Sequence, residues 1–288
     1  MKNNNKIVTI LGGNGYIGSY VADIFLKKGF SVKILDIKKP KIKKKNVKYF
    51  LGSILEKKIV KSAIKDATFV FNFAALADID EASRKPYATA EINILGVINV
   101  LMICNTLGVK KIIQASSIYA NSEQGSFYGC SKKASEDYIE RFFERYKLRY
   151  SILRFGSLYG GFIKNGSGLQ KLIYQAKKDN RLVYSGTKNA SREYIYIEDA
   201  AEACYEIIKK KYDNKYLILT GNQKIKIKKV VKIIKEKLNI KNSRIFFKNI
   251  KNNIHYEKYP EAYKPRKGVR FKIKKEQNFK KNLEKLLN

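Results

Sequence analysis

The residues best suited to carry chemistry are a tyrosine and a lysine in the segment Tyr128-Gly-Cys-Ser-Lys132. Residues four apart on a helix share one face, so this phenol and this ammonium can point at the same reacting group. An unperturbed tyrosine, whose pKa is about 10, is a poor base at neutral pH. A neighbouring ammonium favours the phenolate and lowers that pKa, which makes Tyr128 a candidate general base for a hydroxyl proton.

The end of an expected strand supplies a third polar group for the same site. Residues 111–117 are expected to form a strand that ends in Ser116 and Ser117. Because ligands of open α/β sheets bind at the carboxyl ends of strands, the Ser117 hydroxyl is expected to hold a substrate oxygen beside Tyr128. This context matters, since a Tyr-x-x-x-Lys spacing also arises by chance in a chain with 20 tyrosines and 60 lysines and arginines.

A glycine-rich turn near the start of the chain is suited to bind a pyrophosphate. The apolar run at residues 6–11 predicts a buried strand, and it leads into Gly12-Gly-Asn-Gly-Tyr-Ile-Gly18. Residues 20–28 predict an amphipathic helix that ends at Gly29. Glycines let the backbone approach phosphate oxygens, whose charge the amide groups and the helix dipole receive. Glycines after a strand also serve simply as a turn, so the motif alone is weak.

An acidic residue follows the next expected strand and bears on the choice of cofactor. Residues 31–35 predict a strand, and Asp36 stands at its carboxyl end. An acidic side chain at this distance from the glycine turn can accept hydrogen bonds from both hydroxyls of an adenosine ribose, and it repels a ribose phosphate. The sequence therefore favours NAD over NADP, although a solvated aspartate at a strand end is the simpler alternative. With NAD, the positive nicotinamide ring would act with the ammonium to lower the pKa of Tyr128. Tyr128 would then remove a hydroxyl proton while the adjacent carbon gives hydride to the nicotinamide.

The elements that must position these residues alternate between strand and helix. This alternation predicts βαβ units, right-handed crossovers and a doubly wound parallel sheet of the Rossmann type. The expected strands are residues 6–11, 31–35, 47–51, 67–75, 111–117 and 149–155, and the expected helices are 20–28, 56–64, 88–107 and 128–146.

The alternation breaks after Gly160-Gly161. Beyond it we expect strands at 192–197 and 216–220 and helices at 169–178, 199–211, 228–238 and 276–287. The chain is therefore expected to divide into an NAD-binding Rossmann domain over residues 1–160 and a smaller substrate-binding part over 161–288. Residues 190–222 are expected to return to the Rossmann core.

The composition argues against several classes of protein. The net charge of +35 comes mostly from lysines spread over all 288 residues, as an AT-rich genome would also produce, so a nucleic-acid partner is not expected. Cys104, Cys130 and Cys204 form no Cys-x-x-Cys pair, which argues against disulfides and structural zinc. No run of eighteen apolar residues and no room for a signal peptide are found, so a cytoplasmic protein without membrane association is expected.

The sequence lacks the residue patterns of serine hydrolases, of Walker-type nucleotide-binding proteins and of metal sites. His255 is the only histidine and no Gly-x-Ser-x-Gly is present, which disfavours a serine hydrolase. No lysine follows the glycine turn in Walker fashion, and we expect no metal site. Cys130 is expected to be a small packed helix residue rather than a reactive thiol.

Taken together, these features resemble the extended short-chain dehydrogenase/reductase superfamily, in its NAD-dependent epimerase/dehydratase branch that acts on nucleotide sugars. The resemblance extends to about Thr220 and weakens afterwards. The motifs that carry it are Gly12-Gly-Asn-Gly-Tyr-Ile-Gly18, Asp36, Gly52-Ser-Ile54, Phe73-Ala-Ala75, Asn93-Ile-Leu-Gly96, Ser116-Ser117, Tyr128-x-x-x-Lys132, Leu153-Arg-Phe155 and Arg192-Glu-Tyr194.

The resemblance implies a role for each of these positions. Ser117, Tyr128 and Lys132 would be catalytic, Lys132 would also hold the nicotinamide ribose, and Arg192 would bind the diphosphate of the substrate beside Ser117 and Tyr128. The pyrophosphate of NAD would lie at the glycine turn and its adenine at Ile54. The cofactor-binding set comprises Gly12, Gly15, Tyr16, Ile17, Gly18, Asp36, Ser53, Ile54, Phe73, Ala74, Ala75, Asn93 and Lys132.

The sequence departs from the family pattern at several positions near the expected substrate. Ser53 stands where the family usually has aspartate, Ser157 where it has asparagine, and Asn121 where it has tyrosine. The segment between Ser117 and Tyr128 is about half the usual length, which predicts a more open or differently shaped sugar pocket.

We therefore expect an enzyme, namely an NAD-dependent nucleotide-sugar epimerase that acts through a transient keto sugar. A dehydratase is the first alternative, although such enzymes generally carry an Asp-Glu pair where this chain has Ile118-Tyr119. A reductase of keto sugars that uses NAD(P)H is harder to separate. An alternative of another class is a non-catalytic protein that binds NAD or nucleic acid. The helices at 88–107 and 128–146 are expected to pair in a homodimer, as in related enzymes, or to be buried against the sheet alone.

Overall fold

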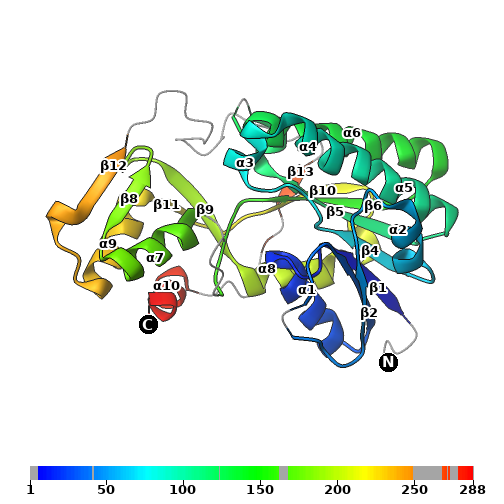
Figure 1. Ribbon diagram of the computed structural model, residues 1–288, viewed down its shortest axis with the longest axis horizontal. Helices are drawn as coiled ribbons and strands as arrows, with labels where there is room; N and C mark the ends of the chain where they lie inside the picture. The colour runs from blue at the N-terminus through cyan, green and yellow to red at the C-terminus, as the bar shows by residue number, and fades with distance from the viewer. Residues whose placement is uncertain are drawn as a thin grey trace.

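A parallel sheet forms the centre of the larger lobe (Figure 1). The computed structural model describes residues 6–40, 42–122, 124–161, 168–248, 268–270, 272 and 278–287. In these residues one sheet of eight strands has the order β13-β10-β6-β5-β4-β1-β2-β3, with neighbouring strands parallel. Its strands are β1 (Ile7–Leu11), β2 (Ser31–Asp36), β3 (Val47–Leu51), β4 (Phe69–Asn72), β5 (Lys111–Ser117), β6 (Tyr150–Phe155), β10 (Lys215–Leu219) and β13 (Gly268–Arg270).

Helices cover both faces of this sheet, which confirms the expected doubly wound fold. On one face α1 (Tyr16–Lys27) and α8 (Ile197–Ile207) pack on Val8, Ile10 and other side chains of alternate strand positions. On the other face lie α2 (Lys57–Ile64), α5 (Gly96–Thr106) and α6 (Ser126–Tyr146). Because both faces are covered, the central strands β1 and β4 are mostly apolar, with Thr9 and Asn72 as buried polar exceptions.

The second lobe is smaller and carries its own core. Its aromatic and aliphatic side chains, among them Tyr159, Leu172 and Ile234, form a separate buried cluster. β10 and α8 follow residue 161 in the chain but belong to the larger lobe, where β10 extends the sheet and α8 packs on α1. The elements of the second lobe are β7 (Ser157–Tyr159), β8 (Leu182–Ser185), β9 (Ser191–Tyr196), β11 (Lys224–Lys226), β12 (Ile245–Lys248), α7 (Gly168–Asp179), α9 (Ile227–Leu238) and α10 (Phe279–Leu287).

Several elements differ from the sequence-based expectations. The helix expected over 88–107 is a succession of α4 (Pro86–Ala90), a π-helical turn at Glu91–Leu95, and α5. The structure adds α3 (Ile79–Arg84) and the strands β7, β8, β11, β12 and β13, most of which are too short for a periodic pattern to show. The start of the helix expected at 276–287 lies outside the described residues, and α10 begins at Phe279.

One helical segment among those described, Pro86–Thr106, is long and apolar enough by composition to cross a membrane. Core helices of soluble proteins pass the same test, and this segment packs on α6 and, through α5, on α2. It is therefore only weak support for a membrane span.

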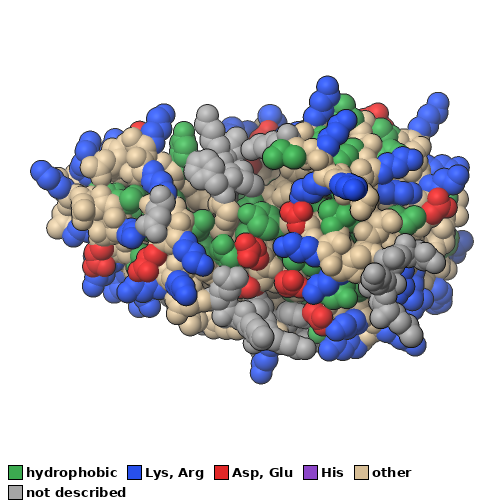
Figure 2. Space-filling model, turned by 90° about the horizontal axis from the view of Figure 1, so that it is seen from below, with side chains coloured by type: hydrophobic (Ala, Val, Ile, Leu, Met, Phe, Trp, Pro, Cys, Tyr) green, Lys and Arg blue, Asp and Glu red, His purple; other side chains and the backbone are tan. Residues whose placement is uncertain are grey.

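Figure 2 shows that the lysines and arginines on the face seen from below are spread over both lobes, with acidic side chains among them.

Candidate active site

The glycine turn between β1 and α1 leaves no room for a side chain at Gly12 or at Gly18. Gly12 adopts a left-handed backbone conformation, with φ of 76°, and a Cβ there would lie 2.7 Å from the backbone nitrogen of Ala74. A Cβ on Gly18 would lie 2.3 Å from the carbonyl oxygen of Gly12. Gly15 caps α1 without a side-chain hydrogen bond, and the first turn carries no acidic residue. The amide groups at this helix end can therefore receive an anion such as a pyrophosphate.

Asp36 lies directly beside this turn. Its Oδ2 accepts a hydrogen bond of 2.9 Å from the backbone N–H of Asn14, and its Oδ1 accepts one of 2.9 Å from that of Lys38. These contacts fix the carboxylate at the end of β2. Each carboxylate oxygen can accept a second hydrogen bond, so both remain able to accept from a pair of ribose hydroxyls.

Ser117, Tyr128 and Lys132 meet at the carboxyl end of β5. The hydroxyls of Ser117 and Tyr128 share a hydrogen bond that lowers the pKa of Tyr128, but burial outweighs it and raises that pKa to about 12. Lys132 Nζ donates to the carbonyl of Ala115 at 3.1 Å and lies 5.6 Å from the centroid of the Tyr128 ring. Burial lowers the pKa of Lys132 to about 8, against the opposing effect of Glu136.

The pKa of Tyr128 bears on its expected role as a base. We expected the ammonium of Lys132 and an oxidised nicotinamide ring together to favour the phenolate. Among the protein groups alone burial dominates, and the phenol holds its proton at neutral pH. Lys132 donates to the backbone carbonyl of Ala115 instead. Tyr128 therefore needs a further positive charge, such as an oxidised nicotinamide ring, to act as a base near neutral pH.

A comparison with known protein families shows to which family the chain belongs. The model of the NAD-dependent epimerase/dehydratase family matches residues 8–218, which is most of the chain. The chain belongs to this family. The expected family and the expected cofactor, NAD, are thereby confirmed, and so is the expectation of an enzyme.

Curated members of the family have more than one activity. A protein of Methanocaldococcus jannaschii that is provisionally named UDP-glucose 4-epimerase is 25% identical, over 96% of this chain and 99% of its own. A UDP-N-acetylglucosamine 4,6-dehydratase (inverting) of Campylobacter jejuni is 27% identical over 69% of this chain, which spans 62% of that protein. The comparisons thus support nucleotide-sugar chemistry without fixing the reaction.

Solved structures of family members share the fold. The UDP-glucose 4-epimerase of Thermus thermophilus, in complex with NAD, gives a TM-score of 0.82 at 22% identity and covers 98% of this chain and 97% of its own. A UDP-N-acetylglucosamine 4-epimerase of Methanobrevibacter ruminantium, in complex with UDP-N-acetylmuramic acid, gives 0.83 at 21% identity and covers 100% and 98%. At these identities the likeness establishes the Rossmann-type fold with its smaller second lobe.

Two of the expected cofactor-binding residues, Asn93 and Tyr16, make side-chain hydrogen bonds within the protein. Asn93 is buried in the π-helical turn, where it accepts from the backbone N–H of Leu76 at 2.9 Å and donates to Ser131 Oγ at 3.0 Å. It thereby holds the segment after β4 against α6. The hydroxyl of Tyr16 donates to the carbonyl of Gly160 at 2.7 Å, and Gln170 Nε2 of α7 donates to the same carbonyl at 2.6 Å. Tyr16 thus joins the glycine turn to the start of the second lobe.

The remaining cofactor positions surround the carboxyl ends of β1, β3 and β4. Ile54 is buried against Gly96, and the backbone N–H of Ser53 donates to Glu56 at 2.8 Å. The ring of Phe73 stacks on Phe71, with centroids 5.9 Å apart. Other half-buried members of the set are Ile17, Ala74 and Ala75.

Arg192 lies in the second lobe, on β9. Its Nη1 donates to the carbonyl of Ser191 at 2.9 Å, and its Nη2 donates to the hydroxyl of Tyr184 at 3.3 Å. The guanidinium is thus held by β8 and β9. An arginine held in this way has a fixed planar fork, the geometry that suits a diphosphate.

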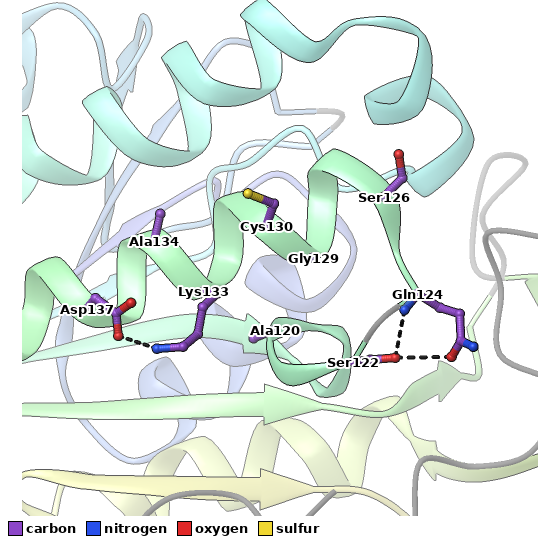
Figure 3. Close-up of a pocket in the computed structure, with 9 residues that line it drawn as sticks. All are labelled: Ala120, Ser122, Gln124, Ser126, Gly129, Cys130, Lys133, Ala134 and Asp137. Carbon is purple, nitrogen blue, oxygen red and sulfur yellow. Dashed lines mark hydrogen bonds and ion pairs between the residues drawn. The ribbon is translucent and has the colours of Figure 1, made fainter.

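A pocket of about 440 Å³ lies on another face of α6, away from Tyr128 and Lys132 (Figure 3). Lys133 pairs with Asp137 there, and Ser122 bonds Gln124. Cys130 lines this pocket and is exposed, so the expectation that it packs inside was wrong, because it lies on the outward face of α6. Among the described residues, no group of three or more His, Cys, Asp or Glu could hold a metal ion.

Replacing Asp36 with serine is expected to weaken NAD binding roughly tenfold or more, since hydrogen bonds to a charged carboxylate contribute about 1.5–3 kcal/mol each. The affinity for NADP should rise at the same time, because the repulsion of a ribose phosphate is lost. Isothermal titration of both dinucleotides measures the two changes. Asp179→Ser, at an exposed position of α7, is the control. An unchanged NAD affinity in Asp36→Ser would show that this carboxylate does not contact the ribose.

Proposed function

We propose that the chain is an NAD-dependent nucleotide-sugar epimerase that works through a transient keto sugar. The observation that carries the proposal is the meeting of Ser117, Tyr128 and Lys132 at the carboxyl end of β5, in the same lobe as the glycine turn and Asp36. The near full-length match to a protein named as an epimerase supports it.

The residues present fit NAD. The glycine turn has no space for any Cβ at Gly12 or Gly18, as expected where a backbone must approach a pyrophosphate, and the Asp36 carboxylate is fixed beside it. We propose that these residues hold the pyrophosphate and the adenosine ribose, that Ile54 lies against the adenine, and that Lys132 holds the nicotinamide ribose. When bound, NAD supplies the acceptor and the donor of a hydride.

The residues of this chain would handle the proton. Tyr128 takes the proton of the sugar hydroxyl that is oxidised and returns it when the ketone is reduced. Ser117 holds the same oxygen from the other side, and Lys132 supplies positive charge near the phenolate. Inversion follows when the keto sugar presents its opposite face before reduction, so the pocket must allow the sugar to rotate. A short segment between Ser117 and Tyr128 is suited to such an open pocket.

The second lobe would bind the nucleotide sugar. We propose that residues 1–160 bind NAD and that 161–288 bind the substrate, with 190–222 returning to the Rossmann core. Arg192, oriented by Tyr184, is then placed to bind the diphosphate. We also propose a cytoplasmic location, which fits the three free cysteines.

A panel of UDP-, GDP-, dTDP- and CDP-sugars incubated with the NAD-loaded protein tests the function. Chromatography with mass spectrometry and proton NMR should find a new sugar of unchanged mass with an inverted centre. Loss of one water from the product would instead identify a dehydratase, which Ile118 and Tyr119 after Ser117 disfavour. A lasting loss of NADH absorbance with keto sugars would identify a reductase. A protein that binds no NAD would contradict the whole proposal.

We propose that the helical segment 86–106 and helix α6 of two chains pair into a homodimer. Large apolar side chains on these helices are 44–55% exposed, namely Leu95, Met102, Phe127, Tyr138 and Tyr146. Pairing of the helices would remove these side chains from water. Light scattering should give twice the 33.2 kDa of one chain, and Met102→Glu with Tyr138→Glu should halve that mass. Phe246→Glu, on β12 of the second lobe, is the control and should leave the mass unchanged. A wild-type chain that is monomeric would contradict the dimer.

A further inference from the structure

Glu136 of α6 and Arg154 of β6 form a buried ion pair next to the candidate catalytic residues. Glu136 of α6 is fully buried, and its Oε1 accepts from Ser116 Oγ at 2.6 Å and from Arg154 Nε at 2.9 Å. Its Oε2 accepts from Arg154 Nη2 at 2.6 Å. Ser116 and Arg154 are also buried. Burying two charges costs several kcal/mol per ion, so such a pair is weak support for a purely stabilising role.

The position of this pair relates it to the catalytic residues rather than to the core at large. Glu136 follows Lys132 by four residues, so both side chains lie on one face of α6. Ser116 directly precedes Ser117 on β5, and Lys132 Nζ bonds the carbonyl of Ala115 at 3.1 Å. Helix α6 is thus joined to the last residues of β5 at two points, one helical turn apart. These two points fix how Tyr128 faces Ser117.

The charged groups near Lys132 lie on two elements, α6 and β6. Glu136 of α6 is the carboxylate that raises the pKa of Lys132. Arg154 of β6 carries the opposing charge, and its guanidinium lies 4.4 Å from the ring centroid of Tyr216 on β10. Asn93, which packs against α6 through Ser131, is neutral. Glu136 therefore supplies the negative charge that favours the ammonium form of Lys132.

We propose that Ser116, Glu136 and Arg154 are positioning residues of the reaction proposed above, on which this inference rests. Their hydrogen bonds hold α6 against the carboxyl end of β5. The Glu136 carboxylate also keeps the Lys132 side chain protonated beside Tyr128. In their absence Lys132 loses its proton at lower pH, and the phenolate of Tyr128 loses the charge that favours it. Nothing in the sequence pattern alone separates this role from ordinary packing.

The test needs a variant that removes the charges without leaving one of them unpaired. Glu136→Gln alone leaves a buried Arg154 cation, which destabilises a fold strongly. We therefore choose the double variant Glu136→Gln/Arg154→Met, in which both charges are lost. The matched control is Lys111→Met/Asp213→Asn, because Lys111 and Asp213 form another ion pair with a buried lysine, 2.8 Å long, at the opposite end of β5. Ser116→Ala removes a single hydroxyl and is the mild variant.

The readout is the titration of the Tyr128 phenol in the NAD-loaded protein, followed by NMR of ring-labelled tyrosine and assigned with Tyr128→Phe. The double variant should move this titration upward by roughly one pH unit. The acid limb of kcat/KM should move in the same direction, since less ammonium at Lys132 makes the phenolate harder to form. The control pair should alter thermal stability and leave the titration unchanged.

Ser116→Ala keeps the test decisive if the double variant does not fold. It should lower kcat by roughly two- to tenfold with little change in KM. The reason is that the variant loses the hydrogen bond between β5 and Glu136 of α6 and leaves the substrate contacts in place. A folded double variant with an unmoved titration, or Ser116→Ala with unchanged kcat, would overturn the inference. The titration requires no turnover, so a wild type that epimerises no nucleotide sugar would refute the proposed function separately.

Discussion

Replacing Tyr128 with phenylalanine is expected to lower kcat by about 10²- to 10⁴-fold, the usual contribution of a general base. The hydroxyl that is lost shares a hydrogen bond with Ser117, whereas the ring that remains still packs against Ile118 and Tyr119. The fold and the NAD affinity should therefore be unchanged. Initial rates of epimerisation and calorimetric titration of NAD measure the two quantities on one protein sample.

Tyr87→Phe is the matched control for this experiment. Tyr87 lies on α4 and is 78% exposed, so its hydroxyl should contribute nothing to turnover. A Tyr128→Phe variant that retains wild-type kcat would remove Tyr128 from the mechanism. A variant that loses NAD as well would point to a structural defect instead.

Replacing Gly18 with alanine is expected to destabilise the fold by roughly 2–4 kcal/mol, in the range of strongly disruptive core substitutions. The added methyl group would lie 2.3 Å from the carbonyl oxygen of Gly12, and backbone atoms at that distance must move apart. Because the same turn is proposed to hold the pyrophosphate, NAD affinity should fall together with stability. Urea unfolding with and without NAD measures both effects.

Gly168→Ala serves as the control for the glycine turn. Gly168 begins α7, and a Cβ there meets no atom within 4 Å. Alanine at a helical position should be neutral or slightly stabilising. If Gly18→Ala proved as stable as Gly168→Ala and bound NAD normally, the close packing of the turn would not be required for either property.

The parts of the fold that follow a regular pattern were predictable from the sequence. The mostly apolar runs at β1, β2 and β5 place Gly12, Asp36 and Ser117 at strand ends, because a buried parallel strand is rich in apolar residues and stops where the turn begins. The spacing of Tyr128 and Lys132 fixes their shared face of α6 in the same way. The trio is thus brought together by periodicity and by the rule for strand ends.

Other features depend on contacts that no local pattern encodes. The pairing of Glu136 with Arg154 joins residues on a helix and a strand, and only the packed structure shows that both are buried. Tyr16, which we expected beside the pyrophosphate, also donates its hydroxyl to the carbonyl of Gly160, 144 residues away in the chain. The raised pKa of Tyr128 follows from burial, which the sequence suggests only indirectly. Short strands such as β7 and β11 have three residues each and carry no readable alternation.

The large sheet is completed late during synthesis, because its last strand, β13, lies near the end of the chain. β13 pairs with β10 in parallel, and residues 220–267 lie between them in the chain. During synthesis the outer edge of β10 therefore stays open until most of the second lobe has left the ribosome. An open strand edge can pair with another chain, and domains fold as units from the N-terminal side. In the interval before β13 is made, a nascent chain can therefore aggregate through the open edge of β10.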